Sequence, residues 1–256
     1  MADQHVTGLF VWNELMTKDV KVAQDFYTQL FGWTFKHEKI AEIDYHMAFV
    51  GEEAVAGMMQ LQPGQGEHSA WLNYVTVDDV DQRTTRATEL GGRKILDAMD
   101  IPNIGRFSII SDPAGACISP FRGTEPSQHP QEKPGAGTFC WYELMTRDPE
   151  QAKQFYPEIF GWELEKYDAP GRPYWMFSAG EKAVAGIEEI PAGADFPEHW
   201  LSYVAVADVD ATAKRAAELG GQVYKEPTDI PNIGRFAVLA DPTGGVIALF
   251  KEQPKP

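Results

Sequence analysis

The chain has little of what marks several large classes of protein. Two cysteines, Cys117 and Cys140, among 256 residues provide neither a disulfide framework nor a cysteine-based metal clip, and they suit a reducing cytoplasm. Lys and Arg number 22 against 38 Asp and Glu, which gives a formal net charge of −16. Because that field repels a phosphate backbone, we expect no nucleic-acid partner.

Long apolar runs are missing as well. No stretch approaches the ~20 apolar residues that span a bilayer, and the polar N-terminus lacks the apolar region of a signal peptide. We therefore expect a soluble, cytoplasmic protein with no membrane partner. The hydrophobic content of 43% is enough for one large core or two ordinary ones.

Internal repetition is the strongest positive signal. The segment FVWNELMTKD begins at Phe10 and FCWYELMTRD begins at Phe139, an offset of 139 − 10 = 129 residues. The octapeptide DIPNIGRF recurs at the same offset, at 100–107 and 229–236. We predict two copies of one domain, at residues 1–123 and 137–256, joined by a polar, proline-rich linker at 124–136.

Each copy has the pattern of an α+β fold, with the order strand, helix and three strands occurring twice. Alternating apolar residues predict a strand from Leu9 to Met16. Asp19 then precedes a helix with apolar residues at helical spacing, and Gly32 has the position of a C-cap glycine. Asp79 and Asp148 are the expected caps of later helices.

The order of these motifs resembles the vicinal-oxygen-chelate superfamily, which includes glyoxalase, bleomycin-resistance and extradiol dioxygenase proteins. The resemblance is carried by Asp19…Phe26-Tyr27…Phe31-Gly32-Trp33, by Asp112-Pro113-Ala114-Gly115, and by their copies at +129. With W-x-E-L-M-T before the helix, the chain is similar to two-domain glyoxalase-like proteins of actinobacteria, which include a mycobacterial antigen and proteins labelled hydroxylases. The resemblance implies that the two βαβββ modules of each copy form a curled mixed-sheet cup for a small molecule.

The resemblance also implies a divalent metal held by His, Gln or Glu on the first and last strands of a module. The corresponding positions here are Trp12, Leu72 and Ser119, and in the second copy Trp141, Leu201 and Ala248. Indole and aliphatic groups have no lone pair to give such a metal. The six histidines fall in termini, expected turns or the linker, and none recurs at +129. We therefore expect no metal and no other cofactor.

The candidate site residues follow from strand periodicity together with the resemblance, which implies that the ligand positions Trp12 and Leu72 face the cup. Period two places Trp12, Glu14 and Met16 on one face, and Leu72 shares a face with Tyr74. A carboxylate among Trp and Met loses hydration, which suits a general acid or base. We predict Glu14 and Glu143 as catalytic residues, in pockets that comprise Trp12, Met16, Tyr74 and Arg106 in the first copy and Trp141, Met145, Tyr203 and Arg235 in the second.

The same residues allow a structural interpretation. Glu14 and Arg106, and likewise Glu143 and Arg235, could be buried ion pairs among core aromatic residues. The repeated octapeptide could be a shared turn or the rim of a ligand site. Arg106 and Arg235 are repeated cations near the expected cup, so the ligand could carry an anionic group.

Four functions are compatible with this pattern. The leading hypothesis is a metal-independent lyase or isomerase that acts on a small carbonyl or aromatic metabolite. The alternatives are a sequestering protein of the bleomycin-resistance type and a metal-dependent lyase or dioxygenase with atypical ligands. An interaction role through the acidic surface is a further possibility, and we expect a monomer or a homodimer.

Overall fold

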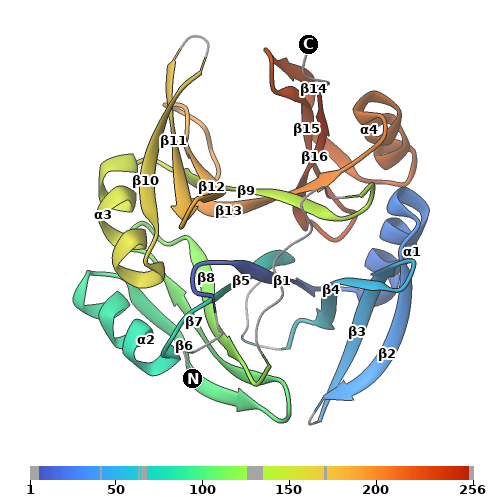
Figure 1. Ribbon diagram of the computed structural model, residues 1–256. Coiled ribbons are helices and arrows are strands. Elements are labelled where there is room, and N and C mark those ends of the chain that lie inside the picture. Colours follow the sequence, from blue (N-terminus) through green and yellow to red (C-terminus); the bar gives the residue numbers. More distant parts are fainter. Residues whose placement is uncertain are drawn as a thin grey trace. The chain divides into compact units, whose positions relative to one another are not determined.

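The computed structural model describes residues 6–40, 42–62, 64, 68–125, 135–169 and 172–253. Most of the predicted linker lies outside the described residues. Both repeats have the predicted order of elements (Figure 1). The first repeat comprises β1 (Phe10–Thr17), α1 (Val20–Phe31), β2 (Thr34–Ile40), β3 (Ile43–Val50), β4 (Glu53–Gln60), β5 (Ala70–Thr76), α2 (Val80–Glu89), β6 (Arg93–Ile101), β7 (Gly105–Ser111) and β8 (Cys117–Gly123). The second comprises β9 (Phe139–Thr146), α3 (Pro149–Phe160), β10 (Glu163–Ala169), β11 (Arg172–Ala179), β12 (Lys182–Glu189), β13 (His199–Ala205), α4 (Val209–Glu218), β14 (Gln222–Ile230), β15 (Gly234–Ala240) and β16 (Val246–Glu252).

Each repeat contributes one eight-stranded mixed sheet. The strand order is β2-β3-β4-β1-β5-β8-β7-β6 in the first repeat and β10-β11-β12-β9-β13-β16-β15-β14 in the second. β1 pairs with β4 and β5 with β8 in parallel, whereas β3 and β7 pair with their neighbours in antiparallel. The predicted α+β fold with a duplicated βαβββ order is therefore confirmed.

Aspartate caps begin the helices of both repeats. The side chain of Asp19 accepts a hydrogen bond from the backbone N–H of Val22, and Asp79, Asp148 and Asp208 make the same bond three residues along. Each bond satisfies a backbone donor that has no partner within the helix. Gly32 ends α1 with φ 74°, a left-handed conformation that glycine adopts without steric cost. Over the described residues, no helix has the length and apolar character that crossing a bilayer requires.

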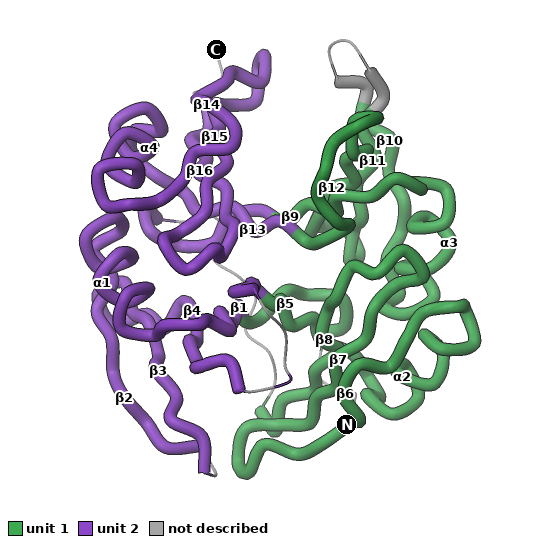
Figure 2. The backbone as a smooth tube through the Cα atoms, turned by 180° about the vertical axis from the view of Figure 1, so that it is seen from behind, with its two compact units in different colours: residues 1–12, 72–130, 142–200 green, residues 13–71, 131–141, 201–256 purple. Residues whose placement is uncertain are grey.

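Two compact units divide the chain, and each draws on both repeats (Figure 2). Unit 1 consists of residues 1–12, 72–130 and 142–200, and unit 2 of residues 13–71, 131–141 and 201–256. The core of unit 1 joins Ile118 of the first repeat to Leu144 and Phe177 of the second. The core of unit 2 likewise joins Leu15 to Leu249. In each unit, therefore, one module from each repeat shares a single core.

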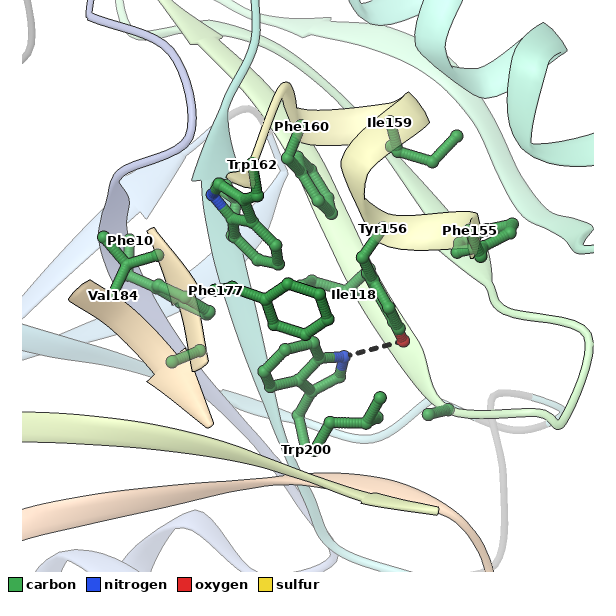
Figure 3. Close-up of a cluster of buried hydrophobic side chains, with 14 of the residues drawn as sticks. Phe10, Ile118, Phe155, Tyr156, Ile159, Phe160, Trp162, Phe177, Val184 and Trp200 are labelled. Carbon is green, nitrogen blue, oxygen red and sulfur yellow. Dashed lines mark hydrogen bonds between the residues drawn. The ribbon is translucent and has the colours of Figure 1, made fainter. Parts of the chain in front are cut away.

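A hydrogen-bonded tryptophan, tyrosine and aspartate link the repeats inside unit 1. Trp200 Nε1 donates to Tyr156 Oη at 3.0 Å, the bond drawn in Figure 3. Tyr156 Oη donates to Asp112 Oδ2 at 2.9 Å, and the other oxygen of Asp112 accepts from the backbone N–H groups of Gly115 and Ala116. The D-P-x-G aspartate of one repeat is thus a hydrogen-bond acceptor for the F-Y tyrosine of the other.

Unit 2 repeats this arrangement with the roles of the repeats exchanged. Trp71 Nε1 lies 3.2 Å from Tyr27 Oη, which donates to Asp241 Oδ2 at 2.9 Å. Burial and the adjacent carboxylates raise the pKa of Tyr27 and of Tyr156 well above the ordinary value of 10.0. Both phenols therefore stay protonated in the folded protein, as donors to a buried carboxylate require.

Candidate functional site

The first module of the second repeat has one face toward the core of unit 1 and one face away from it. Leu144, Phe177 and Ile187 point into the core, and residues alternate along each strand. The opposite face therefore carries the neighbours of these residues, and we call it the site face of the second repeat. Its members are Glu143, Met145, Tyr174, Met176, Gly186 and Glu188.

Glu143 and Tyr174 form the central contact of this face. Tyr174 Oη donates a hydrogen bond of 2.6 Å to Glu143 Oε1. The two residues are on β11 and β9, with β12 between them, and Gly186 of β12 lies directly opposite Glu143 in the register. A Cβ atom at Gly186 would lie 1.6 Å from Tyr174 Oη. A side chain here would displace the tyrosine hydroxyl, because the tyrosine reaches the carboxylate across the space that a Cβ atom would fill.

The first module of the first repeat, in unit 2, has the same strand register, and its residue types match except that Met59 stands where the second repeat has Glu188. Leu15, Ala48 and Met58 point into the core of unit 2. The opposite face is the site face of the first repeat, and its members are Glu14, Met16, Tyr45, Met47, Gly57 and Met59. Glu14 lies opposite Gly57, and Gly57 lies opposite Met47. Glu14 and Tyr45 are only 8% and 9% exposed, so the acid of this face is buried.

In each repeat, the predicted tryptophan and the predicted acid belong to different units. Trp12 belongs to unit 1, whereas Glu14 belongs to unit 2, and Trp141 and Glu143 are divided in the same way. Both indoles are half-buried. Met16 and Met145, by contrast, lie in the same unit and on the same face as the neighbouring glutamate, as predicted from strand periodicity.

Tyr74 and Arg106 are not brought together. The Tyr74 ring contacts Phe107 at 5.8 Å and Phe121 at 6.0 Å between centroids. Arg106, the neighbour of Phe107, points to the other face of β7, where it donates to Asp81 of α2 at 2.7 and 2.8 Å and to Asp100 at 2.9 Å. The predicted pocket that holds both residues does not form within unit 1, because adjacent residues of a strand face opposite sides.

Unit 2 shows the same separation of Tyr203 from Arg235. The Tyr203 ring is 6.4 Å from that of Phe236 and 6.5 Å from that of Phe250. Arg235 donates to Asp210 and Asp229 at 2.7 to 2.8 Å. The two repeated arginines thus pair with aspartates of α2, β6, α4 and β14. The ion pairs of Arg106 with Glu14 and of Arg235 with Glu143, which were the structural interpretation of the sequence, are not formed.

The repeated octapeptide forms the turn between β6 and β7 and its counterpart between β14 and β15. Asn103 and Asn232 both have φ 63°, a left-handed conformation that asparagine tolerates better than most residues. A hollow of about 510 Å³ lies against the second copy, lined by Pro231, Asn232 and Arg235 among others. Arg235 is engaged by Asp210 and Asp229, and both copies of the motif make the same turn.

The metal expected from the superfamily does not fit the residues present. Trp12, Leu72, Trp141, Leu201 and Ala248 offer no donor at the corresponding positions, and the Ser119 hydroxyl donates to the Ser108 carbonyl at 2.7 Å. Within the described ranges, no group of three or more His, Cys, Asp or Glu side chains is arranged to hold a metal ion.

The placement of the histidines in turns was partly wrong. His37, His46 and His199 lie on strands β2, β3 and β13. His37 and His46 are opposite each other in the register, and His46 is also opposite the core residue Met58. They are therefore on the face of the sheet that carries the core residue Met58, which is the face opposite to that of Glu14.

Sequence reasoning missed Tyr174, the residue that contacts the candidate acid. The signal was present, because Tyr45 and Tyr174 are 129 residues apart, as are Gly57 and Gly186. Recurrence of a tyrosine, a glycine and a glutamate on three neighbouring strands could have indicated the group. The cross-strand register that joins them is not visible in one sequence.

The fold and the two equivalent faces define a protein of duplicated βαβββ modules with an acid at the centre of each first module. Residues 4–119 and 138–249 match the Glyoxalase/Bleomycin resistance protein/Dioxygenase superfamily. The chain therefore belongs to this superfamily, as the resemblance predicted.

Relatives with high coverage support the same conclusion. The chain is 38% identical over 249 residues to "Putative glyoxylase CFP32" of Mycobacterium tuberculosis, with 95% of each chain covered. It is 34% identical over 256 residues to "Anthracycline biosynthesis protein DnrV" of Streptomyces peucetius, with 93% of this chain and 90% of the relative covered. The Mn(II)-bound glyoxalase from Novosphingobium aromaticivorans has the same fold, with a TM-score of 0.62 at 12% identity over 95% of this chain and 82% of that one.

Proposed function

We propose that the chain is an enzyme that moves a proton on a small carbonyl-bearing or aromatic molecule without a metal, as a lyase or an isomerase does. Glu14 and Glu143 are the general bases. The observation that carries this proposal is the 2.6 Å hydrogen bond from Tyr174 to Glu143 on the site face of the second repeat.

The chemistry follows from the geometry of the pair. A general base must be held in a fixed orientation within hydrogen-bond reach of the proton that it removes. The Tyr174 phenol orients the carboxylate, and the thioethers of Met145 and Met176 provide an apolar surface on the same face. For a substrate with a hydrogen next to a carbonyl, the carboxylate takes the proton as the C–H bond breaks, and the electron pair moves to the carbonyl oxygen. When that carbon also carries a hydroxyl, the product is an enediolate, and a proton shift between its two oxygens with return of the proton to the former carbonyl carbon completes an isomerisation.

The names of the relatives support a small-molecule site and leave both the reaction and the substrate open. One relative is named as a glyoxylase and another as a protein of anthracycline biosynthesis. Both names concern small organic molecules, which supports a small-molecule site here.

Exchange of carbon-bound hydrogen tests the proposal directly. We use α-hydroxyacetophenone, a neutral aromatic ketone, in deuterium oxide and follow loss of its α-proton signal by NMR spectroscopy. The wild-type chain is expected to accelerate the exchange, and the Glu14→Gln/Glu143→Gln variant to lose at least ~100-fold of that rate, the usual contribution of a general base. Affinity for the ketone should change less than about threefold, since the amide is isosteric with the carboxylate.

Glu52→Gln/Glu181→Gln is the matched control. These glutamates are also 129 residues apart, but they are exposed and lie in turns. The control is expected to retain the wild-type rate. Binding without exchange in the wild-type chain would contradict the enzyme proposal and favour a sequestering protein. Exchange that appears only after a divalent metal is added would favour the metal-dependent alternative.

A further inference from the structure

Two histidines of the first repeat lie side by side on neighbouring strands, and the proposed reaction does not use them. His37 of β2 and His46 of β3 are directly opposite each other in the antiparallel register, and their ring centroids are 4.9 Å apart. We infer that this pair is a binding site for a divalent transition-metal ion such as Zn²⁺ or Cu²⁺. The site is separate from the proposed function, because the pair lies on the opposite face of the sheet from Glu14.

The separation of the two rings fits chelation of one ion. An imidazole nitrogen binds Zn²⁺ at about 2.0–2.1 Å, which puts the centroid of its ring about 3.2 Å from the ion. Two rings bound at the right angle of a tetragonal ion, or at the wider angle of a tetrahedral one, therefore have centroids about 4.5–5.2 Å apart. The observed 4.9 Å lies within this range, and the interplanar angle of 49° shows that the rings are not stacked face to face.

Asp44 orients one of the two rings. Its Oδ1 lies 3.0 Å from Nε2 of His37. Because a carboxylate can only accept a hydrogen bond, Nε2 carries the hydrogen, and Nδ1 of the neutral ring carries the lone pair. A carboxylate behind a ligating histidine fixes the orientation of the ring and makes its other nitrogen a better donor to a metal. Asp44 thus acts through His37 and is not a third ligand, which agrees with the finding that no cluster of three donor groups occurs in the described part of the chain.

The surroundings of the pair also favour a bound cation. The side chains of His37 and Asp44 are 54% and 71% exposed, so an ion and its waters can reach them from solvent. Burial, and then the neighbouring His37, lower the pKa of His46 from the ordinary value of 6.5, so that its ring is neutral at pH 7 and has a lone pair. Lys39, which lies opposite Asp44, is paired with Glu42 at 3.6 Å.

The second repeat has other residues at the corresponding positions. Lys166 and Trp175 stand at +129, and they are opposite each other in the same register. An indole has no lone pair to give a metal ion. The Trp175 ring instead packs against a cation of the chain itself, since Lys153 Nζ lies 4.0 Å from its centroid. The inference therefore gives one ion per chain, in the first repeat.

Two probes test the inference on the full chain, prepared without an affinity tag and freed of metal by a chelator. Calorimetric titration with Zn²⁺ is expected to show one site per chain, which His37→Gln and His46→Gln each weaken at least ~tenfold, because half of the protein's donors are lost. Electron paramagnetic resonance of the Cu²⁺-loaded chain should show two coordinating nitrogens in the wild type and one in each variant.

His199→Gln is the matched control. This histidine lies on β13 in the other unit, and its Nδ1 is 2.8 Å from the carbonyl oxygen of Pro197. Its loss should change neither the affinity for Zn²⁺ nor the number of nitrogens bound to Cu²⁺.

Variants at Asp44 test its orienting role. Asp44→Ala should weaken Zn²⁺ binding by about 10–100-fold, the usual cost of losing such a carboxylate. Asp44→Asn keeps an acceptor for the His37 Nε2–H group and should retain more of the affinity. Equal affinities of the two variants would contradict the orienting role.

The outcomes separate this inference from the proposed function. Undiminished binding of Zn²⁺ and a two-nitrogen Cu²⁺ signal in a His37→Gln/His46→Gln chain with wild-type circular dichroism would overturn the inference, because the ion would be held elsewhere. Failure of the wild-type chain to bind either ion would overturn it as well. Neither result touches the proposed function, which depends on proton exchange by Glu14 and Glu143. The double histidine variant is expected to exchange protons at the wild-type rate, and loss of exchange would contradict the separation of the two sites.

Discussion

Gly186 has no side chain, and this leaves the space in which Tyr174 contacts Glu143. On a strand in the middle of a sheet, glycine normally weakens the element, because it has no side chain to pack. Here the hydroxyl of Tyr174 takes the place of the Cβ atom and reaches Glu143. The residue therefore has a steric role that its backbone conformation does not reveal, since its φ is not among the positive values.

A double-mutant cycle measures this role. Gly186→Ala is expected to destabilise the wild-type chain by about 1–3 kcal/mol, the usual cost of overpacking. In a Tyr174→Ala background the same substitution should cost close to nothing, because the colliding ring is gone. The free energies come from urea unfolding. Gly135→Ala, where nothing lies within 4 Å of the added Cβ, is the control for the alanine itself. Equal costs in both backgrounds would contradict the steric interpretation.

Single residues were predictable where local rules decide their placement. Alternation along one strand was enough to put Glu14 with Met16 and Glu143 with Met145. Tyr174 was missed because its partner lies two strands away. Arg106 was assigned to the pocket on charge and recurrence alone. Its hydrogen-bond partners are Asp81 and Asp100, because the face of β7 that carries Arg106 is the one turned toward α2.

At the scale of elements, the sequence predicted helices better than strand ends. The caps at Asp19, Asp79 and Asp148 are confirmed, since an aspartate before an amphipathic run is a local signal. The strand β6 has no simple pattern, although it runs for nine residues from Arg93 to Ile101. Register shifts at Lys94/Leu96 and Leu96/Met99 interrupt its alternation, and the hydrophobic pattern is lost there.

The cap of α3 offers a test at this scale. Asp148 accepts a hydrogen bond of 2.9 Å from the backbone N–H of Gln151. Asp148→Ala should lower the free energy of unfolding by about 0.5–2 kcal/mol, and Asp148→Asn should retain most of it, because asparagine caps helices about as well. Urea titrations followed by circular dichroism supply the values. If the asparagine variant were as unstable as the alanine variant, the charge rather than the cap would be responsible.

For the whole molecule, the repeat was evident but the pairing of modules was not. Tyr27 and Tyr156 occupy equivalent positions, and so do Asp112 and Asp241. A tyrosine could therefore bond the aspartate of its own repeat or that of the other, and the two choices look identical in the sequence. Only the folded chain shows that each tyrosine bonds the aspartate of the other repeat.

Alkaline unfolding tests this inter-repeat linkage. The pKa of Tyr27 and of Tyr156 is raised in the folded state, mainly by burial and then by the neighbouring aspartate. Stability from these groups is thus fully present below the ordinary pKa of 10.0 and is lost as the pH rises above it. We expect the Tyr27→Phe/Tyr156→Phe variant to have a lower free energy of unfolding than the wild-type chain at neutral pH. Above pH 10.0, its free energy of unfolding should fall less steeply than that of the wild-type chain.

Ultraviolet absorbance of phenolate, recorded during unfolding at each pH, supplies the measurement. In the wild-type chain, part of the phenolate signal should appear only when the protein unfolds. Tyr224→Phe, which removes a tyrosine that is 56% exposed, serves as the control and should leave the alkaline slope unchanged. An unchanged slope in the double variant would show that these buried phenols do not control alkaline stability.

The division into units has a consequence for rearranging the gene. Most residues of unit 1 are contiguous in the sequence, from Leu72 to Trp200, with a short interruption at 131–141. Unit 2 consists mainly of the two segments that flank this stretch. A circular permutant with new ends between β4 and β5, and with the old ends joined, would encode nearly the whole of each core as consecutive sequence. In the permutant the two modules of each unit would follow one another along the chain, whereas in the natural chain only the modules of unit 1 do so.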